Sequence, residues 1–116
     1  MVFGGRIVAT VNFAPGVGGF AACITCAADD SLNVTLEITS DCRQIRRLAE
    51  QLTQLAVLDE LGHPITETQT YRTAAACRTH AACPVPSAIL KAIEVAAGMA
   101  LPADVHISVQ NDAATC

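Results

Sequence analysis

Three stretches near the N-terminus repeat with a period of two, and they constrain the fold more than any other feature of this chain. They run over residues 6–13, 20–27 and 32–39. This period is typical of strands with one buried and one solvated face. Turn formers separate the stretches, with proline and glycines at 14–19 and two aspartates and a serine at 29–31. The pattern therefore predicts an antiparallel meander of three strands.

Helical spacing begins after the third stretch. Ile45, Leu48, Leu52 and Leu55 recur every three or four residues, which predicts one helix from Cys42 to about Asp59. Asp41 is a suitable cap, and Gln44 follows at the spacing of a capping box.

The second half of the chain predicts a loop over 64–71, a short helix over Arg72 to Cys77 and a longer helix over Pro84 to Ala97. Prolines are tolerated in the first turn of a helix, so Pro84 and Pro86 mark the start of the longer helix. Gly98 suits its left-handed C-cap. Val105 to Val109 alternates again, which predicts a last strand before a polar tail that contains Cys116.

This order, β-β-β-α-α-α-β, indicates one α+β domain over residues 1–116, with a mostly antiparallel sheet of about four strands and helices packed on one face. A chain of 116 residues is long enough for one core and too short for two domains. Aromatic residues make up only 3% of the chain, so small aliphatic side chains must fill that core.

Charge and hydropathy exclude several classes of function. The net charge is −4 with seven lysines and arginines, which argues against nucleic-acid binding. Lys91 and Glu94 interrupt the longest apolar run, so no membrane span is expected. Met1 to Pro15 lacks the layout of a signal peptide, and we expect a cytoplasmic protein whose six cysteines are reduced.

Two of these cysteines, Cys42 and Cys83, stand where helices are expected to begin. The partial positive charge and unpaired N–H groups of a helix N-terminus stabilise a thiolate, which is the nucleophilic and metal-binding form. Both are therefore candidate catalytic and cofactor-binding residues. We expect their helices to lie side by side on the sheet.

Other candidate ligands surround Cys83. Cys77, His80 and Cys83 are spaced three apart, and with Cys42 they form a candidate mixed nitrogen and sulfur metal site. Cys23 and Cys26 have the C-x-x-C spacing, but residues three apart in a strand point to opposite faces. We expect no shared role for that pair.

The segment Cys83-Pro84-Val85-Pro86, with Ile89-Leu90-Lys91-Ala92, resembles the C-P-x-P helix start of TusA-type sulfur carriers, which implies a persulfide on Cys83. Three strands, a cysteine opening a helix and a later His-x-x-Cys resemble the layout of NifU- and IscU-type iron–sulfur scaffold proteins. The segments 40–42 and 80–86, with the run after them, are also similar to a small uncharacterised cysteine-bearing family of anaerobic bacteria and archaea.

Three functions remain open. The first is a thiol protein that handles sulfur or an iron–sulfur cluster through Cys42 and Cys83, with His80 as a further ligand or proton donor. The second is a zinc or transition-metal protein that uses Cys42, Cys77, His80 and Cys83. The third is a binding module whose cysteines only fill the core. We expect a protein partner in sulfur or metal transfer, a homodimer is an option, and no hydrolase or transferase motif is present.

Overall fold

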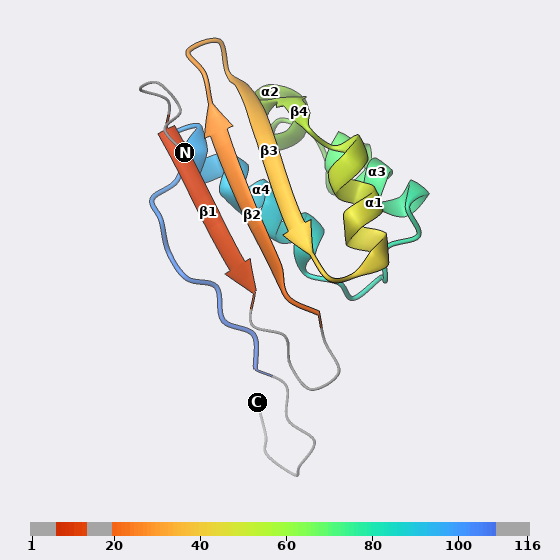
Figure 1. Cartoon of the computed structure of the whole chain (residues 1–116). Helices are drawn as coiled ribbons and strands as arrows, with labels where there is room; N and C mark the ends of the chain where they lie inside the picture. Colours follow the sequence, from red (N-terminus) through yellow and green to blue (C-terminus); the bar gives the residue numbers. More distant parts are fainter. Residues whose placement is uncertain (1–6, 14–19, 109–116) are drawn as a thin grey trace.

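The computed structural model describes residues 7–13 and 20–108, with side chains over residues 20–108. These residues form four strands, four α-helices and one 3-10 helix (Figure 1). Their bounds are β1 Ile7–Phe13, β2 Ala22–Ala28, β3 Asn33–Ser40, α1 Arg43–Gln51, β4 Gln54–Ala56, α2 Val57–Leu61, η1 Ile65–Glu67, α3 Gln69–Ala76 and α4 Val85–Ala96. The turn predicted at 14–19 and the tail with Cys116 lie outside the described residues.

The sheet is antiparallel throughout, with strand order β1-β2-β3-β4. The predicted meander of three strands is confirmed, with bounds within two residues of those expected. The Asp29 carboxylate accepts hydrogen bonds from the backbone N–H groups of Ser31 and Asn33, at 2.9 and 3.0 Å. An aspartate that bonds the backbone ahead of it favours a turn, so this side chain helps to reverse the chain between β2 and β3.

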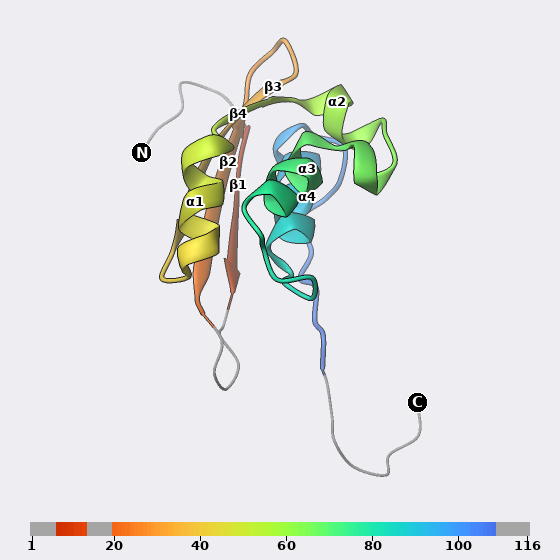
Figure 2. The ribbon, with the colours of Figure 1, turned by 90° about the vertical axis from the view of Figure 1, so that its right-hand side faces the viewer.

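One face of the sheet is covered and carries the core. Figure 2 shows α3 and α4 together on one side of the strands, whereas α1 lies beside β3 at the edge of the sheet layer. The covered face of β2 and β3 is aliphatic, and it packs on buried residues of α1 and α4. The fully buried aliphatic side chains of this core include Ile24, Val34, Ile45, Leu48, Leu52, Ile89 and Ile93. The α+β class is thereby confirmed.

The single helix predicted from Cys42 to Asp59 is wrong, because residues 52–56 interrupt it and helix resumes only in α2. Leu52 leaves the helical conformation with φ −113° and ψ 78°, and β4 then pairs with the start of β3. The Thr53 carbonyl accepts the Leu36 N–H at 2.8 Å, and the Leu32 carbonyl accepts the Val57 N–H at 2.9 Å. The open edge of β3 supplies these partners, so tertiary pairing overrides the helical spacing that Leu52 and Leu55 share.

Helix α3 begins earlier than expected, at Gln69 inside the predicted loop. The Thr68 hydroxyl oxygen accepts the Tyr71 N–H at 3.1 Å and caps the helix. Weak hydrophobic periodicity concealed this start, because the buried positions of α3 are Thr70 and Ala74 rather than large aliphatic residues.

The strand predicted over Val105 to Val109 is wrong for its described part. Residues 101–108 form neither helix nor strand. Val105 and Ile107 are 68% and 74% exposed, so their alternation has no apolar surface to cover. The short fourth strand of the sheet is β4, from the middle of the chain.

Candidate functional site

Cys42 is the N-cap residue of α1, with extended backbone at φ −83° and ψ 128°. Its N–H donates to the Ser40 hydroxyl at 3.1 Å, and that hydroxyl donates to the Ala21 carbonyl at 2.7 Å. Its thiol donates to the Gln44 amide oxygen at 3.3 Å. No side chain caps α1, so the expected cap by Asp41 is wrong. The half-buried thiol is thus held at the helix start by the end of β3.

Cys83 lies two residues before the first residue of α4, for which Pro84 is the N-cap. Its N–H donates to the His80 carbonyl at 2.9 Å, which closes a turn directly before the helix. The side chain is half-buried and packs against the core. The helix start predicted from the two prolines is confirmed to within one residue.

The helices that follow these two cysteines begin at the same end of the molecule in both views (Figures 1 and 2). They do not lie side by side as expected. Helix α4 packs on β1 and β2, α1 packs on β3, and α3 contacts both helices. Ala74 of α3 and Cys77 directly after it belong to the same core cluster as the buried residues of α1 and α4.

The three residues spaced three apart do not share one environment. Cys77 is the C-cap of α3 and is only 3% exposed, whereas His80 is exposed. Across residues 20–108, no group of three or more histidine, cysteine, aspartate or glutamate side chains has the arrangement of a metal site. The ligand set Cys42, Cys77, His80 and Cys83 therefore stays a prediction, without a preformed cluster behind it.

The backbone conformation of Arg78 explains why Cys77 is buried and His80 is exposed. It adopts a left-handed conformation with φ 56°, and the Thr79 N–H bonds the Ala74 carbonyl at 3.0 Å. The Arg78 N–H bonds the Ala75 carbonyl at 3.0 Å, which completes a Schellman motif. The chain turns sharply after Cys77, so that residue faces the core while His80 faces solvent.

Replacing Arg78 by glycine is expected to stabilise the protein by about 1 kcal/mol, because glycine adopts the left-handed conformation without the steric cost that a Cβ imposes. Thermal or urea unfolding measures the change. Arg72→Gly is the matched control, since Arg72 lies inside α3 and glycine there should cost about 1 kcal/mol. A loss of stability in Arg78→Gly would contradict the assignment.

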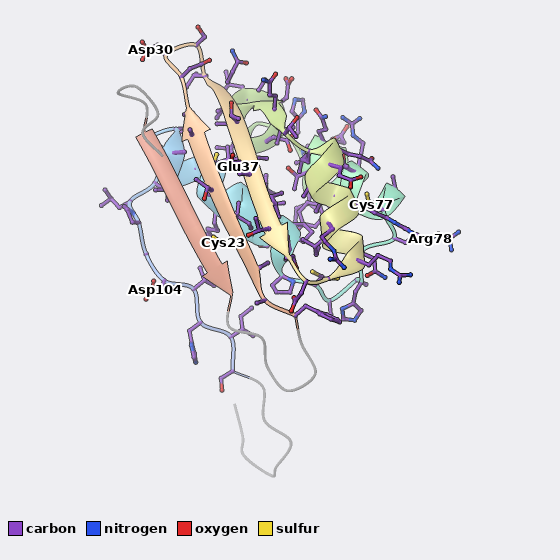
Figure 3. All side chains as sticks on the ribbon, in the orientation of Figure 1. Cys23, Asp30, Glu37, Cys77, Arg78 and Asp104 are labelled. Atoms are coloured by element: carbon purple, nitrogen blue, oxygen red, sulfur yellow. The ribbon has the colours of Figure 1, made fainter. Side chains whose placement is uncertain are left out.

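Cys23 and Cys26 point to opposite faces of β2, as predicted. Cys26 is fully buried on the covered face, and burial raises the pKa of its thiol from 9.0 to about 12. Cys23 is half-exposed and pairs across the sheet with Thr39. Figure 3 shows Cys23 and Glu37 on the open face of the sheet. The C-x-x-C spacing therefore does not form a joint site.

Glu60 is a buried charged residue that sequence reasoning missed. It is 2% exposed, and its carboxylate accepts the N–H groups of Gln69 and Thr70, each at 2.8 Å. The Thr70 hydroxyl donates to the same carboxylate. A carboxylate at the positive end of a helix is favourable, so Glu60 anchors α3 from a neighbouring helix. No local pattern could reveal a cap nine residues away.

Two further observations concern a polar hollow and the lengths of the helices. A hollow of about 370 Å³ is lined mainly by polar residues at the β3 and β4 end, among them Asp29, Asn33 and Gln54, and no cysteine lines it. In the described part of the chain, no helix is long and apolar enough to cross a membrane.

The fold and the site define a class, namely a small α+β protein with two half-buried thiols where helices begin. Residues 9–109 match a family of unknown function, DUF6951, and the chain belongs to that family. The prediction that the chain belongs to an uncharacterised family is thereby confirmed. No curated protein and no solved structure matches the chain, so the likenesses to TusA-type carriers and to NifU- and IscU-type scaffolds stay predictions.

Proposed function

We propose that this protein carries sulfane sulfur as a cysteine persulfide and exchanges it with a protein partner, through Cys83 and Cys42. One observation supports this most. Both thiols are half-buried at the starts of α4 and α1, at one end of the molecule, whereas Cys26 and Cys77 are sealed in the core (Figures 1 and 2). Cys23 is also half-exposed, but it lies within β2, so Cys42 and Cys83 are the accessible thiols beside helix starts, where a thiolate is stabilised.

The chemistry needs no external oxidant. The Cys83 thiolate attacks the outer sulfur of a donor persulfide, R–S–SH, and a new S–S bond forms as the donor S–S bond breaks. The donor leaves as a thiolate and takes up a proton. Cys83 then holds one added sulfur atom, and a second thiolate, on Cys42 or on the partner, takes it by the same exchange.

An iron–sulfur cluster or zinc bound by Cys42, Cys83 and His80 is the alternative. Structural zinc sites use four ligands, and iron–sulfur clusters are also held by four cysteines or a cysteine and histidine mixture. The described residues bring no three such groups together, so a metal would need ligands from outside residues 20–108, from a partner or from a second copy. The persulfide requires one reactive thiol and is therefore favoured.

We expect Cys83 to alkylate with iodoacetamide at least about tenfold faster than Cys26 or Cys77 near neutral pH, because thiolate character and access set the rate. Mass spectrometry of peptides from timed samples measures each rate. Cys83→Ser should remove the part of the fast phase that belongs to Cys83, and the matched variant Cys23→Ser should leave it. Because Cys83 is half-buried, Cys83→Ser should lower the free energy of unfolding by no more than about 1 kcal/mol.

The persulfide itself is tested on reduced protein under anaerobic conditions. Incubation with glutathione persulfide should add one sulfur atom to the intact mass, and Cys83→Ser should lose most of this gain. Reaction of Cys83 only on unfolding would mark it as a core-filling residue and contradict the proposal. Stoichiometric zinc, or iron with acid-labile sulfide, in the purified protein would overturn it in favour of a metal protein.

A further inference from the structure

Five exposed arginines lie on the contacting helices α1 and α3 and directly after α3, and we call them the arginine face. Its members are Arg43, Arg46 and Arg47 of α1, Arg72 of α3, and Arg78 directly after α3. They are five of the seven lysines and arginines in a chain of net charge −4. Helices α1 and α3 contact each other, and Figure 3 shows Arg78 projecting outward, near nitrogen-tipped side chains beside α1.

The two helices direct these side chains away from the core. The buried residues of α1 are Ile45 and Leu48, which lie on the side opposite to Arg43 and Arg47 at 100° per residue. The buried residues of α3 are Thr70 and Ala74, again opposite to Arg72. The arginine face is therefore a consequence of the same periodicity that builds the core.

No carboxylate of residues 20–108 lies within ion-pair distance of the arginine face. Over residues 20–108, the only ion pair within 4.0 Å joins Lys91 and Glu94 on α4, at 3.6 Å. The five guanidinium groups are thus available to an external anion.

Two of these arginines, Arg43 and Arg78, occupy positions that do not favour folding. Arg43 lies at the positive end of α1, where cations are disfavoured, and the first turn of that helix holds no acidic residue. Arg43 is also three and four residues from Arg46 and Arg47, spacings at which like charges repel, whereas Glu50 lies at the corresponding attractive spacings from Arg46 and Arg47. Arg78 occupies a left-handed position that suits glycine. Helix-end charge and backbone conformation therefore do not account for arginine at positions 43 and 78.

We propose that the arginine face docks an acidic segment of a partner protein. Guanidinium groups bind carboxylates in a bidentate manner, and all five cations are arginine rather than lysine. Single-stranded nucleic acid is disfavoured as the occupant, because its binding relies on aromatic stacking. The only aromatic residue of α1 and α3 is Tyr71, which is half-buried, and the exposed Phe20 lies before β2, outside the arginine-bearing helices. Cys42 adjoins Arg43, so a docked partner would reach the thiol at the start of α1.

The probe is a fluorescent peptide of ten glutamates with blocked ends, and binding is read by anisotropy. We expect binding at about 20 mM salt that weakens at least tenfold at about 150 mM, because surface charges are screened. The triple variant R43Q/R46Q/R47Q should bind at least tenfold more weakly. Lys91→Gln, which removes an exposed cation on α4, should bind like the unmodified protein.

Circular dichroism melting should show that the triple variant folds, since all three arginines are exposed. Absence of peptide binding, or equal binding by the triple variant, would overturn the inference. Tighter binding of a ten-nucleotide polyuridine RNA than of the peptide would also overturn it, in favour of a nucleic-acid partner. The assay needs neither sulfur nor metal, so its failure is distinguishable from failure of the persulfide proposal.

Discussion

The free energy of unfolding should fall by up to about 1.4 kcal/mol per pH unit above about pH 9 because of one buried thiol. Burial of Cys26 under α4 raises its pKa from 9.0 to about 12, so the folded chain retains a proton that the unfolded chain loses. The stabilisation is complete below about pH 9 and is lost as pH rises toward about 12. Urea titrations over pH 8–11 measure the slope.

Other groups also titrate above pH 9, so the variant Cys26→Ala is needed to measure the contribution of Cys26 alone. The variant should lose about 1–3 kcal/mol at neutral pH, since it removes a sulfur atom from a packed core, but its stability should decline less steeply above pH 9. Cys23→Ala removes the half-exposed thiol of the same strand and serves as the control. An unchanged slope in Cys26→Ala, or an equal change in Cys23→Ala, would refute the assignment.

Glu60→Ala should lower the free energy of unfolding by about 3 kcal/mol, a large share of the stability of a small domain. The substitution leaves the N–H groups of Gln69 and Thr70, and the Thr70 hydroxyl, without an acceptor inside the protein. Each buried donor without a partner costs about 1–3 kcal/mol, and partial entry of water reduces the sum. Chemical denaturation at pH 7 provides the measurement.

Two further variants test whether the Glu60 carboxylate is the cause of this loss of stability. Glu60→Gln retains one amide oxygen as acceptor and should lose about half as much stability as Glu60→Ala. Glu67→Ala removes an exposed glutamate from η1, close in sequence, and should change stability by no more than about 0.5 kcal/mol. If Glu60→Ala were as stable as Glu67→Ala, the carboxylate would not be the anchor of α3.

Much of the candidate site was predictable because its signals are local. The prolines at 84 and 86 define the start of α4, which places Cys83 just before the helix. The apolar spacing of Ile45 and Leu48 likewise places Cys42 at the start of α1. The relative positions of the two helices were not predictable, because they depend on α3, whose buried face of threonine and alanine gives little periodic signal.

The exposure of the other candidates was also not predictable from their spacing. Cys77 and His80 are three residues apart, yet one is buried and the other exposed, because Arg78 takes a left-handed conformation that sequence rules reserve for glycine or asparagine. The burial of Glu60 was likewise not predictable, because its hydrogen-bond partners lie nine and ten residues further along the chain.

The sequence by itself determined the three-stranded meander, the faces of Cys23 and Cys26, and the helix starts beside Cys42 and Cys83. Each of these depends on interactions between residues close in the chain or on a strict period of two. Only the tertiary structure decided that residues 54–56 form a strand and that Val105 to Ile107 do not. The first segment meets the open edge of β3, and the second meets no apolar surface, because strand formation depends on a neighbour to pair with.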